Sequence, residues 1–127
     1  MDELFSDHHW RLRRDGDLLH LHRTRERVTS LEDYETELKA LRSIMEGFEA
    51  SMGIVMDMRD AVPRNDEAFE AMTGPYRKFF RTYFARCAVV LRTEVGKLNF
   101  QRLDRRDDTT TNMFTSMDEA IAWVKAR

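Results

Sequence analysis

Residues 53–66 read GIVMDMRDAVPRND, and this stretch decides the predicted fold. It opens with an apolar run, Gly53 to Met58, that lacks clean alternation and is interrupted only by Asp57. A short continuous apolar run is typical of a strand that helices cover. The loop of residues 59–66 follows it, at the carboxyl end of the strand, where open α/β sheets usually keep their sites. We therefore expect a central strand that leads into a functional loop.

The loop and the end of the strand carry side chains suited to a polar or anionic ligand or to a protein partner. Arginine forks and the amides at a helix start both bind carboxylate or phosphate. Opposite charges in a short loop also satisfy one another, and such exposed pairs are worth about 0 to 1 kcal/mol. Internal pairing and capping are therefore the alternative to a binding role. The candidate partner or ligand residues are Asp57, Arg59, Asp60, Arg64, Asn65 and Asp66.

The composition indicates a single ordered domain over residues 1–127. Hydrophobic residues make up 42% and charged residues 35% of the chain, as in globular domains and unlike disordered tails. The 21 basic and 23 acidic residues are mixed along the sequence and leave a formal charge of -2. Such a chain has no broad positive field for a polyanion, so we expect no nucleic-acid partner.

The cellular location is predicted from three features of the sequence. The start of the chain, MDELFSDHHW, is acidic and lacks the basic and apolar regions of a secretory signal. No apolar run approaches the length of a membrane span, so we expect no stable membrane insertion. The one cysteine, Cys87, has no partner for an internal disulfide and suits a reducing compartment. Together these features predict a cytoplasmic protein.

Two strands and a helix are expected before the central strand. Residues 10–14 alternate apolar and basic side chains, Asp15-Gly16 is a hairpin turn signal, and residues 19–21 repeat the alternation. Ser30, with an acidic residue three positions later, resembles a capping box. The apolar residues that follow recur at spacings of three and four. These signals predict an antiparallel hairpin followed by a helix that covers the sheet.

A helix rich in aromatic rings is expected after the loop. Asn65 or Asp66 caps it, and Gly74-Pro75 is expected to kink or split it, because proline removes a hydrogen bond and clashes with the preceding turn. The apolar band is wider than a normal core stripe, which favours either a deep core or a surface for self-association, as in a homodimer. The candidate interface residues are Phe79, Phe80, Tyr83 and Phe84.

Two more strands and two more helices are expected downstream. Residues 87–91, CAVVL, predict a second buried strand, and Thr93 is placed to cap a third helix. Residues 105–108 are expected to form a polar turn and residues 109–114 a last strand. Ser116 begins a capping box for the final helix. The predicted fold is α/β, in the order ββαβαβαβα, with a single-layer mixed sheet of about five strands packed by about four helices.

Histidines of the first hairpin are a candidate metal site. His20 and His22 lie two apart on one strand face, and His8 or His9 on the neighbouring strand is a candidate third ligand. The alternative is a solvated sheet face, and no zinc motif supports a metal. We therefore expect no metal and no other cofactor.

No catalytic motif occurs along the chain, so no enzymatic activity is expected. Cys87 opens a buried strand and has no histidine near it in sequence. Buried cysteines usually behave as small hydrophobic residues, and Cys87 is predicted to be one of these rather than a nucleophile.

The order of elements and the position of the loop resemble the STAS domain, the family named for sulphate transporters and anti-sigma factor antagonists. In that family the third strand ends in an Asp-Leu-Ser type turn, which leads to Asp-Ser-Ser-Gly at the start of the second helix. Residues 57–59, DMR, and 65–66, ND, hold comparable positions here, but no serine or threonine lies between Met52 and Met72. The family's phosphorylatable residue is therefore absent.

The resemblance implies a non-enzymatic regulatory or scaffolding domain that acts through contacts with a protein partner of unknown identity. The contact surface would be the loop of residues 59–66 together with the exposed side of the second helix. The broader STAS and Sec14-like grouping implies an alternative, a small-molecule or lipid-binding domain that uses the aromatic second helix and the sheet as its pocket.

Overall fold

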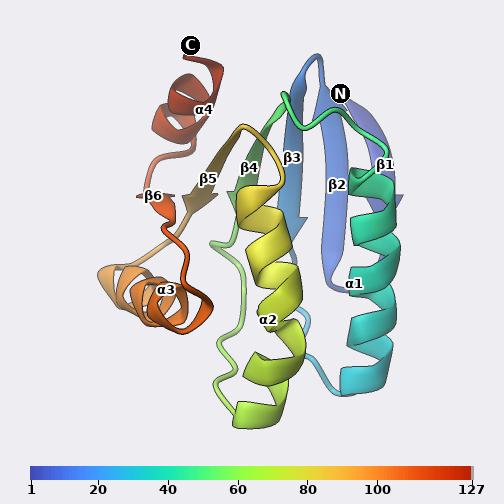
Figure 1. The fold of residues 1–127 in the computed structure, drawn as a ribbon, viewed down its shortest axis with the longest axis vertical. Coiled ribbons are helices and arrows are strands. Elements are labelled where there is room, and N and C mark those ends of the chain that lie inside the picture. The colour runs from blue at the N-terminus through green and yellow to red at the C-terminus, as the bar shows by residue number, and fades with distance from the viewer. Residues whose placement is uncertain (127) are drawn as a thin grey trace.

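The computed structural model describes residues 1–126 as a six-stranded mixed sheet with four helices. The strands lie in chain order across the sheet (Figure 1). They are β1 (Asp2–Ser6), β2 (Trp10–Asp15), β3 (Leu18–Arg23), β4 (Gly53–Asp57), β5 (Arg86–Val90) and β6 (Asn112–Phe114). The helices are α1 (Leu31–Met45), α2 (Glu67–Thr82), α3 (Glu94–Asp107) and α4 (Met117–Lys125).

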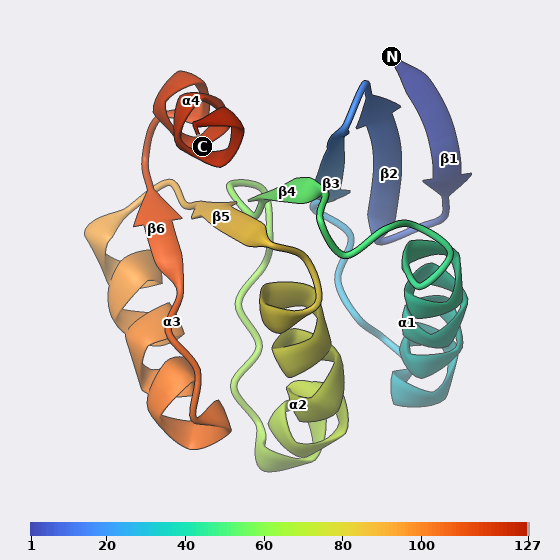
Figure 2. The same cartoon turned by 45° about the horizontal axis from the view of Figure 1, so that its top comes forward.

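The sheet is antiparallel over β1, β2 and β3 and parallel from β3 to β6. Figure 2 shows α1, α2 and α3 on one face of the sheet and α4 alone on the other. The larger core cluster lies between the sheet and α1 and α2, and a smaller cluster lies beneath α4. Because both faces of β4 are covered, its apolar run lacks alternation, as the sequence predicts.

The four predicted helix starts are confirmed by their capping bonds. Ser30 accepts from the Asp33 amide, Thr93 from Gly96 and Ser116 from Glu119. At the start of α2, Asp66 rather than Asn65 is the cap, and it accepts from the Phe69 amide. The predicted hairpin turn also forms, and Gly16 adopts the positive φ of 63° that glycine tolerates best. These signals are local in sequence and local in structure.

The edge strand β1 adds a sixth strand to the five expected. Its sequence, DELFS, has only two apolar residues, Leu4 and Phe5, and they are adjacent. The pairing with β2 shifts between Glu3 and Phe5, so the side chains of β1 do not alternate regularly. An irregular edge strand therefore carries none of the alternation by which a strand is predicted.

Of the kink or split expected at Gly74-Pro75, the split is wrong, because α2 continues through Pro75. Pro75 leaves only the Ala71 carbonyl, four residues earlier, without its helical donor. Burial of the inner face of α2 against the core outweighs the loss of this one hydrogen bond.

The predicted turn at residues 105–108 is also wrong, since α3 extends to Asp107 and ends at Asp108 in the left-handed conformation. The predicted strand of residues 109–114 shortens accordingly to β6. Asp104, within the last turns of α3, accepts from the Thr109 hydroxyl at 2.8 Å and the Thr111 amide at 2.9 Å. These bonds hold the segment after α3 in a turn before the strand begins.

Candidate functional site

A cavity with a volume of ≈ 470 Å³ opens at the carboxyl ends of β4 and β5. It lies between the sheet, α2 and α3, and the loop that follows β4 borders it. Its walls are mainly apolar, as is usual for sites that bind small molecules. Among the lining side chains are Trp10, Tyr34, Met56, Phe69, Phe80 and Phe100.

The first pair of charges in the loop is closed on itself. Arg59 donates to Asp57 from Nε at 2.9 Å and from Nη2 at 3.0 Å, and the Arg59 amide donates to the same carboxylate. Burial alone would raise the pKa of Asp57, but these hydrogen bonds and the arginine charge outweigh it and lower that pKa. Asp57 is therefore held as a carboxylate already paired within the chain.

The end of the loop is tied to α2 and to the segment before α1. Arg64 pairs with Asp66, the cap of α2, and donates from Nη1 to the Val28 carbonyl at 3.0 Å. Its guanidinium also lies over the Phe69 ring, 5.4 Å from the centroid. The neighbouring Asn65 is exposed. Arg64 thus fixes the loop as an edge of the cavity.

Asp60 joins three segments of the chain at this end of the sheet. Its carboxylate contacts Nε2 of His22, at the end of β3, at 3.0 Å and Nη2 of Arg92, after β5, at 2.8 Å. The hydrogen bond from His22, and then the charges of His22 and Arg92, lower the pKa of Asp60. The loop residues therefore form internal pairs, the arrangement weighed as the alternative to a binding role, and their role in binding stays a prediction.

The aromatic residues expected at an interface are mostly in the core. Phe79, Phe80 and Phe84 are buried, and Tyr83 is half-buried with its hydroxyl donating to the Phe48 carbonyl at 3.0 Å. The Arg42 guanidinium of α1 covers Phe79 at 4.4 Å from the ring centroid. The wide aromatic band thus fills a deep core between α1, α2 and the sheet, which is the first of the two predicted alternatives, and a role of these residues in self-association stays a prediction.

The histidines of the first hairpin are separated by their partners. His9 is buried and bonds Glu37 of α1 and the Arg27 carbonyl, whereas His22 bonds Asp60. His20 is partly buried, and burial lowers its pKa. Within residues 1–126, no three metal-ligating side chains are close enough together to hold an ion.

Sequence reasoning missed a set of ion pairs that joins α2 to α3. Arg77 donates to Asp107 from Nε at 2.8 Å and from Nη2 at 2.9 Å. Arg81, of which 9% is exposed, pairs with Asp104 at 3.4 Å. A sequence signal for these ion pairs exists. Two arginines lie four apart on the aromatic side of one helix, and two aspartates lie three apart on the next helix. These pairs hold α3 at one side of the cavity.

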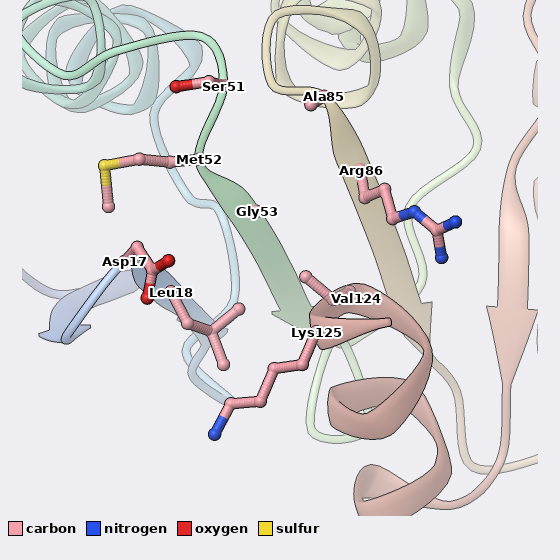
Figure 3. Close-up of a pocket in the computed structure, with 9 residues that line it drawn as sticks. All are labelled: Asp17, Leu18, Ser51, Met52, Gly53, Ala85, Arg86, Val124 and Lys125. Atoms are coloured by element: carbon pink, nitrogen blue, oxygen red, sulfur yellow. The ribbon is translucent and has the colours of Figure 1, made fainter. Parts of the chain in front are cut away.

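A second cavity, also of ≈ 470 Å³, lies at the amino ends of β4 and β5 (Figure 3). Gly53 and Arg86 line it from the two strands, and Val124 and Lys125 line it from α4. Arg86 already donates to the Trp123 carbonyl at 2.6 Å. The carboxyl-end cavity is the better candidate site, because it lies beside the predicted loop and has the larger aromatic lining.

Comparisons with known proteins identify the fold. No protein-family model matches the chain, and no curated protein matches its sequence. Among solved structures, an anti-sigma factor antagonist from Mycobacterium paratuberculosis superposes with a TM-score of 0.59 and 12% identity, covering 92% of this chain and 93% of that one. The chain has a STAS-like fold.

Two further structures share this STAS-like fold. An uncharacterised protein of the DUF3478 family from Shewanella loihica, described as having a SpoIIAA-like fold, gives a TM-score of 0.63 and 17% identity over 95% of this chain and 98% of that one. The NMR structure of the protein TM1081 gives a TM-score of 0.59 and 18% identity over 100% of this chain and 98% of that one. The resemblance inferred from the order of elements is confirmed for the fold. Among the helices of residues 1–126, none combines the length and hydropathy of a membrane span.

Proposed function

We propose that this STAS-like protein is a single-domain, non-enzymatic regulatory module that acts in the cytoplasm by binding a protein partner. One structural neighbour is named an anti-sigma factor antagonist, and such a protein works through a protein partner. The likeness supports a role of this type by analogy, since a fold hosts many functions.

Two exposed apolar side chains carry the proposal. Val95 is 75% exposed and Leu98 is 63% exposed, and both lie near the start of α3. Residues three apart on a helix share one face, so the two side chains form a single patch. Val95 also lines the carboxyl-end cavity together with Val62 of the loop. An apolar patch bordered by a charged loop suits a protein contact.

The start of α2 supports constitutive rather than phosphorylation-controlled binding. The resembled family keeps its phosphorylatable residue there, whereas residues 53–71 contain no serine or threonine. A phosphoserine adds nearly two negative charges at such a position. In this chain Asp66 supplies a permanent carboxylate that caps the helix and pairs with Arg64.

Capture from native lysate, with a variant of the patch, tests this function. Tagged wild-type protein and the Val95→Ser/Leu98→Ser variant are compared by quantitative mass spectrometry, with Ala40→Ser on the exposed side of α1 as control. We expect at least one protein to be retained by the wild type and the control and lost by the double variant. Equal capture by all three folded proteins would rule out the patch as the contact surface.

The carboxyl-end cavity favours a second candidate function, the binding of a small molecule. Its ≈ 470 Å³ falls within the range of about 300–1,000 Å³ common for ligand sites. Thermal unfolding in the presence of apolar small molecules tests it, because a ligand that binds only the folded state raises the midpoint. A midpoint that no such compound raises would count against this candidate.

A further inference from the structure

A buried arginine without an acidic partner borders the carboxyl-end cavity. Arg23, only 3% exposed, donates from Nε to the Tyr34 hydroxyl at 3.3 Å and from Nη1 to the carbonyls of Thr24 and Glu26 at 2.6 and 2.9 Å. Among residues 1–126, no carboxylate pairs with it within 4.0 Å. By contrast, the other buried arginine, Arg81, contacts two aspartates. A buried charge usually requires a counter-charge.

A buried indole beside it lacks an acceptor. Trp10 is 3% exposed, and in the described part of the chain its Nε1 has no hydrogen-bond partner. The indole N–H lies near the Tyr34 hydroxyl oxygen, but the two groups do not form a hydrogen bond of ordinary geometry. Burial raises the pKa of Tyr34, and the nearby indole N–H opposes that rise. Less than 1 Å² of this indole nitrogen is accessible, so the N–H is closed off from the cavity, and the Trp10 ring serves there as an apolar wall.

The two unmatched groups lie side by side. Trp10 and Arg23 are directly paired across β2 and β3, and the Arg23 guanidinium lies 5.8 Å from the centre of the Trp10 ring. Both residues line the same cavity, whose other walls are largely aromatic and aliphatic. The cavity therefore combines an apolar interior with one arginine that has no carboxylate partner among residues 1–126.

We propose that this cavity binds an apolar molecule carrying a single carboxylate, with the carboxylate at Arg23 and the apolar body along the aromatic walls, the Trp10 ring among them. The carboxylate would accept from the guanidinium, whose Nη2 has no hydrogen-bond partner among residues 1–126. Bonds of this charge-assisted kind are among the stronger ones in proteins.

The charges around the cavity favour one carboxylate over a more highly charged group. Arg59, Arg64 and Arg92 also line the cavity, but each is paired with an aspartate. Arg77 and Arg81 are likewise paired with aspartates of α3. A phosphate dianion would thus find a single uncompensated cation, whereas a carboxylate matches it in charge. This inference rests on the small-molecule candidate and is independent of the protein-contact proposal.

Isothermal titration calorimetry with matched acids and amides tests the proposal. The probes are 2-naphthoate and decanoate, which separate an aromatic from an alkyl body, each compared with its neutral primary amide. We expect at least one acid to bind, about tenfold more tightly than its amide, because only the acid carries the charge that Arg23 lacks.

Three variants complete the experiment. Arg23→Gln removes the charge and should make acid and amide bind alike, whereas Trp123→Phe on α4 and Arg14→Gln on the exposed part of β2 should leave both affinities unchanged. If Arg23→Gln fails to fold, the comparison of each acid with its amide in the wild type decides the question. If it folds, an undiminished preference for the acid overturns the proposal. Equal binding of acid and amide by the wild type also overturns it while leaving the small-molecule function standing. No heat with any probe at millimolar concentration overturns both.

Discussion

Replacing Gly53 by alanine tests how closely α4 approaches the sheet. A methyl group at Gly53 would lie 2.2 Å from Cγ1 of Val124, whereas ordinary van der Waals contact lies at 3.4–4 Å. Val124 is buried on the inner side of α4, so the helix must recede by about 1 Å or the side chain must leave its position. Overpacking of this kind typically costs about 1–3 kcal/mol. We expect the free energy of unfolding to fall by that amount.

Urea unfolding followed by far-UV circular dichroism measures the loss by linear extrapolation. Gly96→Ala is the matched control, because a methyl group there meets no atom closer than the Thr93 hydroxyl at 3.5 Å. Alanine is favoured over glycine within a helix by about 1 kcal/mol, so this control should be neutral or stabilising. The same substitution should thus have opposite effects at the two glycines.

A compensating change identifies the contact itself. Val124→Ala removes the methyl group that an alanine at position 53 would meet, so the double variant should be more stable than the two single losses predict. Strict additivity of the two losses would refute the contact between Gly53 and α4, as would a Gly53→Ala protein with wild-type stability. The slope of the urea dependence should stay unchanged in all variants, since each of them exposes the same amount of surface on unfolding.

Three other perturbations have defined outcomes. Asp107→Asn removes the charge that pairs with Arg77, and urea unfolding at neutral pH should show a loss of roughly 1–3 kcal/mol. Burial raises the pKa of Asp107, but Arg77 outweighs burial and lowers that pKa below 3.8 in the folded state. The difference in unfolding free energy between wild type and variant should therefore be complete above pH 3.8 and should vanish as the pH falls through the pKa of Asp107 in the folded protein. Glu37→Leu leaves the buried His9 ring nitrogen without its hydrogen-bond partner and should cost about 1–3 kcal/mol by the same assay, whereas His9→Phe/Glu37→Leu should recover most of the loss. Burial raises the pKa of the Cys87 thiol to about 12, so mass spectrometry should find no alkylation by iodoacetamide until urea unfolds the chain.

The helix starts and the central strand could be predicted because their causes are local. A cap such as Ser30 or Thr93 bonds an amide three residues away, and that spacing is visible in the sequence. The continuous apolar run that begins at Gly53 likewise reports that both faces of its strand are covered. Two internal pairs of the loop were open to prediction for the same reason, since Arg59 and Arg64 each bond a carboxylate two residues away. The contacts of Asp60 with His22 and Arg92 were not, because they join distant segments.

The edge strand, the extent of α3 and the location of the aromatic band depended on contacts that spacing does not encode. β1 is held by pairing with β2 through an irregular register, and Asp104 shapes the chain after α3 through a carboxylate that accepts several bonds at once. The rings of α2 read equally well as core or as surface until α1 is placed against them.

The sequence by itself determined the class of fold and the position of the loop at the end of the central strand, because periodicity and capping act over a few residues. The candidate ligand site was decided only by the tertiary structure. Trp10 and Arg23 are ordinary members of a hairpin in the sequence, and whether each finds a partner depends on side chains from distant segments. Arg77 meets Asp107, thirty residues later, whereas Arg23 meets no carboxylate in residues 1–126. Burial and pairing are properties of the folded chain, so only the tertiary structure shows that Arg23 lies buried beside the cavity without a carboxylate partner among residues 1–126.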